Sequence, residues 1–186
     1  MSLTEAINNL KTEMKSAGIE QEHGLGTELF HFSSTLAPVV NVDLLITDEN
    51  NRVLLSWRED DYTESGWHVP GSCIRFQETL EEAIQRCART ELGAEVEFAP
   101  EPIRVYEFHW NKHRPTIADQ RERAHFITLV YACHLPGDYV LDKHNKTEGQ
   151  VGFLRWFDDM PEDILPIQKC YIRDWEQLKN RIAEGK

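Results

Sequence analysis

Several features that define other protein classes are absent from this chain of 186 residues. No apolar run approaches the about 20 residues that a membrane-spanning helix requires. The chain does not open with a basic segment followed by an apolar stretch, as a secretory signal peptide does. It has no internal repeats and no low-complexity segment. These absences predict a soluble, cytoplasmic protein that has no membrane partner.

Cysteine is scarce and forms no C-x-x-C pair. The four cysteines are scattered along the chain, at Cys73, Cys87, Cys133 and Cys170. This spacing argues against a zinc site or a disulfide framework and indicates a reducing compartment. We therefore expect buried thiols at these positions.

Positive charge is also scarce. The chain has 20 Lys and Arg against 32 Asp and Glu, which gives a net charge of -12. Because binding to nucleic acid depends on many Lys and Arg contacts to phosphates, this balance argues against a nucleic-acid partner. A small anionic substrate is compatible with it if a divalent cation or a local basic cluster offsets the negative field. Residues 111–123 hold several basic side chains, which a solvated loop explains as well as phosphate contact does.

The apolar content is sufficient for one domain. Of all residues, 40% are hydrophobic and 10% aromatic, and 186 residues suit a single core. Ser2 and Glu5 have the spacing of a capping box, so we expect an amphipathic helix at residues 3–17. It would pack on the core or on a second subunit, and a homodimer is therefore one expectation. The glycines at 24 and 26 suggest that residues 18–26 form a linker.

Runs of β-branched and aromatic residues predict a sheet. They lie at residues 28–32, 39–47, 52–58, 94–98, 103–110, 125–134 and 153–157. Turn-forming residues at 48–51 predict a hairpin, and the nearly continuous apolar run 125–134 predicts a central strand. Apolar residues at helical spacing predict a last helix within 161–186. We expect one α/β domain with a mixed sheet, made of residues 1–26, 27–160 and 161–186.

The most informative stretch is residues 71–94, which reads G-S-C-I-R-F-Q-E-T-L-E-E-A-I-Q-R-C-A-R-T-E-L-G-A. It predicts a loop and then a helix that ends at Gly93. One helix face carries Leu80, Ile84, Cys87, Ala88 and Glu91. A carboxylate on a buried face requires a cation, either a metal ion or an arginine at the helix end. On the opposite face we expect Glu82 and Arg86 to pair at i, i+4.

This stretch resembles the signature of the Nudix hydrolases, G-x5-E-x7-R-E-U-x-E-E-x-G-U, in which U is aliphatic. The matching positions are Gly71, Glu78, Arg86, Glu91 and Gly93. Six residues rather than five separate the first two of these, and Cys87 and Thr90 replace two signature glutamates. The GDP-mannose mannosyl hydrolase branch shows the same pattern, and the chain is similar to that branch over residues 39–157.

The resemblance implies a Nudix-type α/β/α sandwich and a hydrolase of a nucleoside diphosphate linked to another moiety, above all a nucleotide sugar. It implies Mg²⁺, with Mn²⁺ as the alternative, bound by Glu91 and the backbone carbonyl of Gly71. Glu78, Arg86 and Gly93 become structural residues of the motif. A site with few carboxylates suits Mg²⁺, which keeps several waters and binds substrate phosphates.

Further substrate-binding residues follow from the same resemblance. Arg58 matches an arginine that contacts the leaving diphosphate, and Asp43 matches an acid near the sugar, although ordinary charges at strand ends explain both equally well. Gln150 matches a glutamine of the metal shell. Cys73 stands where the branch has an arginine, a charge that Arg75 could supply.

The general base is missing from its place in the branch pattern. Val151 stands where the branch has its catalytic histidine, and a valine cannot accept a proton. His144 and Glu148 lie in the same loop and are substitutes by proximity. Two alternatives therefore stay open: an ordinary Nudix pyrophosphohydrolase that attacks phosphorus, and a nucleotide-binding module without turnover.

Overall fold

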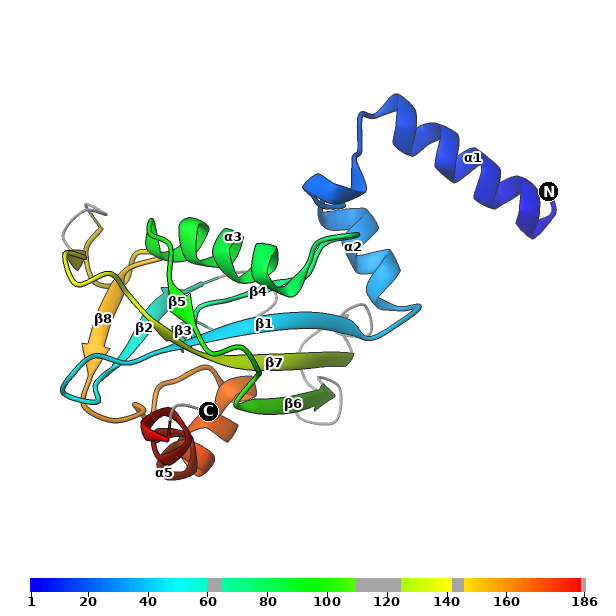
Figure 1. Cartoon of the computed structure of the whole chain (residues 1–186). Coiled ribbons are helices and arrows are strands. Elements are labelled where there is room, and N and C mark those ends of the chain that lie inside the picture. Colours follow the sequence, from blue (N-terminus) through cyan, green and yellow to red (C-terminus); the bar gives the residue numbers. More distant parts are fainter. Residues whose placement is uncertain (60–64, 110–124, 142–145, 185–186) are drawn as a thin grey trace.

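The strands of this computed structural model, which describes residues 1–59, 65–109, 125–141 and 146–184, form two sheets (Figure 1). The larger sheet has the order β4-β1-β7-β5, with β6 also paired to β7, and the smaller has the order β3-β2-β8. The strands are β1 Val39–Ile46, β2 Val53–Arg58, β3 Gly66–His68, β4 Gly71–Cys73, β5 Glu97–Phe98, β6 Arg104–His109, β7 His125–His134 and β8 Leu154–Phe157. Because β1 and β7 are parallel and the other pairs antiparallel, the predicted mixed sheet and central β7 are confirmed.

Helices cover the sheets from both sides. Helix α3, Leu80–Leu92, lies on one face, and α5, Cys170–Ala183, lies on the other (Figure 1). Each helix closes its own apolar core: Ile84 belongs to the first core, and Tyr171 and Trp175 belong to the second. This arrangement confirms the predicted α/β/α sandwich.

Strand β1 shows why these residues form a buried strand. Val42, Leu44 and Ile46 are fully buried in the core beneath α3, whereas Leu45 is buried in the core beneath α5. Successive side chains of a strand point to opposite faces of its sheet, so a strand covered on both faces is mostly apolar, and the buried Asp43 is the exception in β1.

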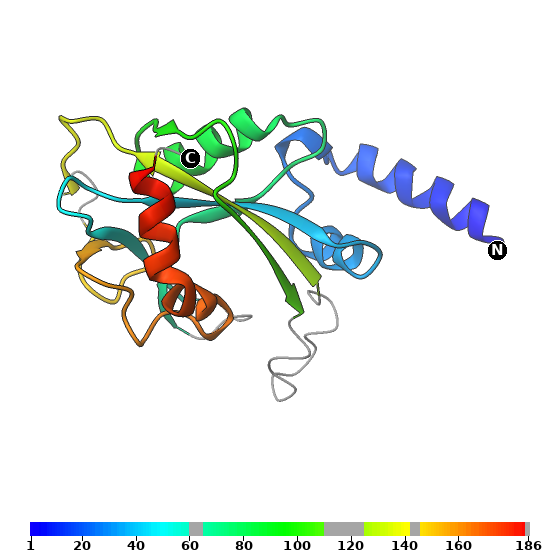
Figure 2. The same cartoon turned by 60° about the horizontal axis from the view of Figure 1, so that its bottom comes forward.

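The N-terminal helix α1, Leu3–Ser16, begins with the predicted capping box. The Glu5 amide donates to Ser2 Oγ, and the Ser2 amide donates to Glu5 Oε2. No residue of α1 is buried, and the helix projects away from the sheets in both views (Figures 1 and 2). Leu3, Ile7 and Leu10 remain exposed. The helix therefore does not pack on the core, and packing on a second subunit stays a prediction.

Two expectations for the chain before the Nudix loop are wrong. A short 3-10 helix, Gln21–His23, is followed by helix α2, Thr27–Ser34, where a strand at 28–32 was predicted. The predicted hairpin does not extend along the strands: β1 and β2 belong to different sheets, and their arms pair only beside the turn, through the antiparallel bridge between Thr47 and Val53 and the hydrogen bond from the Asp48 amide to the Arg52 carbonyl. Asp48 Oδ1 accepts the amides of Asn50 and Arg52, and this tight turn carries the chain from one sheet to the other.

Two further expectations concern thiols and membrane spans. All four cysteines are free thiols: Cys87 and Cys133 are buried, as predicted, whereas Cys73 and Cys170 are only half-buried. Among the residues described, no helix combines the length and the apolar character needed to cross a membrane.

Candidate active site on the loop and helix of residues 71–94

Helix α3 is delimited by local signals at both ends. Thr79 is its N-cap: the Glu82 amide donates to Thr79 Oγ1 at 3.2 Å, and the Thr79 amide donates to Glu82 Oε2 at 2.8 Å. Gly93 closes the helix in the left-handed region, with φ of 67°. The predicted end at Gly93 is confirmed. The predicted pair of Glu82 with Arg86 is wrong, because Glu82 caps the helix instead.

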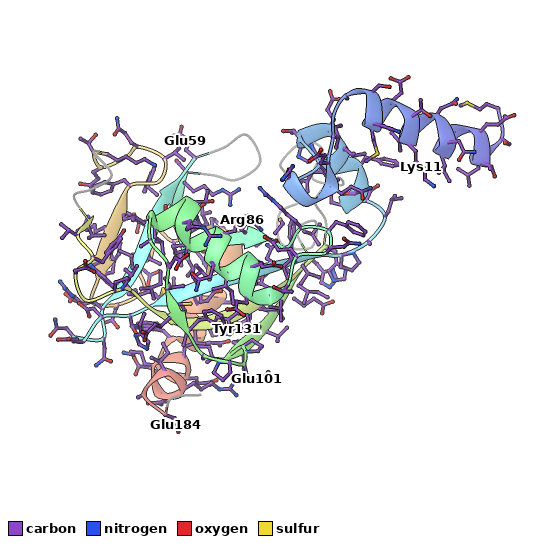
Figure 3. The ribbon with its side chains drawn as sticks, turned by 45° about the horizontal axis from the view of Figure 1, so that its top comes forward. Lys11, Glu59, Arg86, Glu101, Tyr131 and Glu184 are labelled. Atoms are coloured by element: carbon purple, nitrogen blue, oxygen red, sulfur yellow. The ribbon has the colours of Figure 1, made fainter. Side chains whose placement is uncertain are left out.

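Arg86, which lies on α3 (Figure 3), ties the preceding loop to the helix. Its Nε and one terminal nitrogen donate to the two carboxylate oxygens of Glu78, at 2.6 and 2.8 Å. The guanidinium also donates to Ser72 Oγ and to the Cys73 carbonyl, both at 2.8 Å. Glu78 accepts the Arg75 amide as well, and the hydrogen bonds from Arg86 lower the pKa of Glu78. Glu78 and Arg86 thus hold the loop in one conformation.

Gly71 stands directly opposite Asp43 in the pair of β4 and β1. A Cβ atom at position 71 would lie 2.3 Å from Asp43 Oδ1 and 3.1 Å from the Val42 carbonyl oxygen. Only glycine permits this approach of the loop to Asp43.

Asp43 itself is buried, with 4% of its surface exposed. The Tyr171 hydroxyl donates to Asp43 Oδ2 at 2.7 Å, and Gln168 Nε2 lies 3.4 Å from the same oxygen. Burial raises the pKa of Asp43 to about 7, against the lowering effects of the Tyr171 hydrogen bond and of the Arg58 charge.

The sequence reasoning did not assign Tyr171 and Gln168 to the site. They lie in α5 and in the 3-10 helix Pro166–Gln168. The sequence feature that could have indicated Tyr171 is its hydroxyl on the apolar face of the predicted last helix, because a buried tyrosine hydroxyl usually finds a hydrogen-bond partner.

Glu91 lies on the buried face of α3, next to the fully buried Cys87 and Ala88. Leu80, expected on the same face, is instead 43% exposed at the start of the helix. Within the described residues, no hydrogen bond or ion pair reaches the Glu91 carboxylate. Burial raises the pKa of Glu91, while the charges of Arg58 and Lys146 act in the opposite direction.

Asp43, Arg58 and Glu91 form one electrostatic group. The Arg58 charge acts on both carboxyl groups. The two carboxylates also act on the Cys87 thiol. Burial is the largest cause that raises the pKa of this thiol, and the negative charges of Glu91 and Asp43 raise it further. The fold therefore brings together three predicted site residues from β1, β2 and α3.

The donor atoms at this place suit a hard cation. Thr90 is exposed and burial keeps the Cys87 thiol protonated, so Glu91 is the one carboxylate among positions 87, 90 and 91 of this helix. Oxygen donors with few carboxylates are the ligands that Mg²⁺ accepts when waters and phosphates complete its shell. In the described part of the chain, the single cluster of three metal-ligating side chains consists of Glu107, His109 and His125, away from Glu91.

The other predicted residues have local partners. Glu148 is 70% exposed and pairs with Arg155 at 3.1 Å, and Gln150 Oε1 accepts the Thr147 amide at 2.8 Å. The Arg75 guanidinium lies beside Gly24, 3.7 Å from the place of a Cβ atom there. His144 lies outside the described residues.

A comparison with known families agrees with this geometry. The model of the NUDIX domain family matches residues 37–172. The chain belongs to this family. By family and by fold it is a Nudix hydrolase.

Individual relatives were found at two levels of similarity. The low-salt glycan biosynthesis protein Agl8 of Haloferax volcanii is 44% identical over 135 residues, which span 73% of this chain and 80% of Agl8. Among solved structures, a UDP-X diphosphatase is 15% identical with a TM-score of 0.55, and the match covers 98% of this chain and 81% of the other. A MutT NUDIX hydrolase from Burkholderia pseudomallei is 23% identical with a TM-score of 0.52, covering 74% and 97%. At these identities the two structures bear on the fold alone.

Proposed function

We propose that this Nudix hydrolase cleaves a nucleoside diphosphate linked to a sugar, of the GDP-mannose type, in the presence of a divalent cation. Two findings support a sugar. The replacement of signature glutamates by Cys87 and Thr90, together with the extra loop residue, resembles the mannosyl hydrolase branch. In addition, the 44% identical relative Agl8 is named for glycan biosynthesis.

The observation that carries the proposal is the half-buried Glu91 carboxylate, which lies on the helix face of the buried Cys87 and Ala88 and receives no hydrogen bond from the described residues. A buried charge is costly unless it is paired or bound to a metal. Glu91 and the Gly71 carbonyl would hold Mg²⁺, or Mn²⁺. When bound, the cation neutralises charge on the diphosphate as it leaves.

The remaining residues would orient the substrate. Arg58 supplies positive charge beside Glu91 and would bind the diphosphate, with Arg75 and Gln150 at its edge. Asp43 is covered by Tyr171, so we assign it a positioning role: it fixes the place of Gly71 and of the Arg58 charge. The attacking water needs a base within hydrogen-bond reach. We propose His144 or Glu148 for this role.

The decisive experiment measures turnover of a panel of nucleotide sugars in Mg²⁺ and identifies the products. Glu91→Gln should lose more than about 100-fold in activity, since even groups outside the ligand shell change metal affinity about 10- to 100-fold. Glu81→Gln, on the exposed side of the same helix, serves as the control. Equal turnover by Glu91→Gln and the parent would contradict the proposed metal site.

Labelled water separates the two modes of attack. In water enriched in ¹⁸O, attack on carbon puts the label in the sugar and releases nucleoside diphosphate. Attack on phosphorus puts the label in a phosphate product, and nucleoside monophosphate and sugar phosphate appear.

The position of Val151 favours one alternative, a nucleotide-binding module without turnover. This side chain is 55% exposed and cannot act as a base. Calorimetry distinguishes the two functions: tight nucleotide-sugar binding with no product after long incubation in Mg²⁺ or Mn²⁺ supports the binding module, and multiple turnover excludes it.

A further inference from the structure

A second cluster of metal-ligating side chains lies at the ends of β6 and β7. Glu107 and His109 are two residues apart on β6, so both side chains point to the same face of the sheet. His125 is paired directly with His109 across the antiparallel strands. The register of two strands therefore brings one carboxylate and two imidazoles together.

The three side chains converge on one oxygen atom. His125 Nε2 lies 2.9 Å from Glu107 Oε1, and His109 Nε2 lies 3.2 Å from the same atom. The two imidazole rings are stacked, with centroids 4.4 Å apart and planes inclined by 23°. All three ligand atoms lie within 4.8 Å of one another. Two ligand atoms of one tetrahedral ion with bonds of about 2.1 Å are roughly 3.4 Å apart, so small side-chain rotations would admit an ion.

We propose that Glu107, His109 and His125 form a binding site for a divalent transition-metal ion of the Zn²⁺ class. Imidazole nitrogen suits zinc, copper and nickel, whereas Mg²⁺ prefers oxygen ligands alone. Glu107 is 59% exposed and each histidine 30% exposed, so an ion and a water molecule can reach the cluster from solvent.

The proposed site is separate from the one at Glu91. Val130 of β7 is the partner of Asp43 in β1, and His125 lies five residues before Val130 on the same strand. At about 3.3 Å per residue this separation is roughly 16 Å. The ion would instead link the two strand ends that residues 110–124 connect, and it would stabilise the pairing of β6 with β7.

Zinc calorimetry on the untagged full chain tests the proposal, both in the parent and in Glu91→Gln, which removes the anionic ligand of the other site. One equivalent of Zn²⁺ should bind in Glu91→Gln, and at least one in the parent, which keeps the other site. His109→Asn and His125→Asn should weaken this binding by more than about tenfold. His134→Asn, an exposed histidine at the other end of β7, should bind like the parent. Glu107→Gln provides a conservative third variant if a histidine variant fails to fold.

The proposal would be overturned if Glu91→Gln bound no Zn²⁺, or if His125→Asn bound Zn²⁺ as tightly as the parent. It would also be overturned by a Co²⁺ spectrum with a thiolate charge-transfer band, because that band would assign the ion to a cysteine. A Co²⁺ spectrum without that band and a rise in Tm with Zn²⁺ that His125→Asn abolishes would support it. Binding should weaken in acid, because imidazoles must lose a proton to ligate a metal.

Discussion

At the scale of single residues, the site depends on contacts that only certain side chains allow. The Nudix loop passes so close to Asp43 that position 71 has no room for a Cβ atom. Asp43 in turn is held by Tyr171, and its burial keeps its pKa near 7. Gly71 therefore serves the packing of Asp43 as well as the proposed metal site.

Replacing Gly71 tests this packing. Gly71→Ala should lower the free energy of unfolding by about 1–3 kcal/mol, because the added methyl must displace Asp43 Oδ1 or the β4 backbone. Urea denaturation measures the effect. Gly137→Ala is the matched control, since nothing lies within 4 Å of a Cβ atom there. Equal stability of the two variants would show that the loop adjusts without cost.

At the scale of elements, the loop and α3 act as one unit because Arg86 binds Glu78, Ser72 and the Cys73 carbonyl together. Arg86→Lys keeps the charge but loses the planar fork that makes these bonds at once. We expect a loss of roughly 1–3 kcal/mol in stability and weaker activation by Mg²⁺, because the loop carries Gly71. Unfolding curves and Mg²⁺ titrations of activity measure both.

The same helix offers a control for that substitution. Arg89 pairs with Glu95 at 3.0 Å, but the two side chains are 54% and 72% exposed. Arg89→Lys should therefore change stability by less than about 1 kcal/mol. If Arg86→Lys behaved like Arg89→Lys, the bonds to the loop would not hold it in place.

Elements defined by local signals could be predicted from the sequence, and elements defined by distant partners could not. The capping box of α1, the end of α3 at Gly93 and the apolar strand β7 were predicted because their determinants lie within a few residues. Residues 28–32 were too few for a period of two to be told from a helical one. The prediction of a hairpin was wrong because the turn at Asp48 determines only that the chain reverses direction. It does not determine which sheet each of the two strands joins.

At the scale of the whole molecule, the site draws on parts of the chain far apart in sequence. The signature covers residues 71–94, yet Tyr171 reaches Asp43 across 128 residues and Gln168 across 125. Glu91 was predicted from one carboxylate on an apolar face. The cover over Asp43 was not predicted, because it depends on how α5 docks on the sheets. The same dependence explains why the register of β6 with β7, and with it the Glu107 cluster, was missed.

The docking of α5 rests in part on Asp174, which is buried and accepts hydrogen bonds from Arg104, the Tyr106 hydroxyl and Arg173. The Arg173 hydrogen bond is the largest cause that lowers the pKa of Asp174, from 3.8 to about 2. The folded protein thus favours the charged form. This stabilisation is complete above the ordinary pKa and is lost as pH falls from about 4 to 2.

Asp174→Asn tests this contribution through its pH dependence. At pH 7 the variant should be about 1–3 kcal/mol less stable, which corresponds to a Tm lower by roughly 2–4 °C for each kcal/mol. As pH falls from about 4 to 2 the difference from the parent should shrink, because the unfolded chain takes up the proton at the ordinary pKa and the folded parent takes it up only at about 2. Thermal melts between pH 2 and 7 measure it, with Asp138→Asn, an exposed aspartate, as the control. If the difference in Tm between the variant and the parent stayed constant down to pH 2, the packing of the Asp174 side chain rather than its charge would hold α5 to β6.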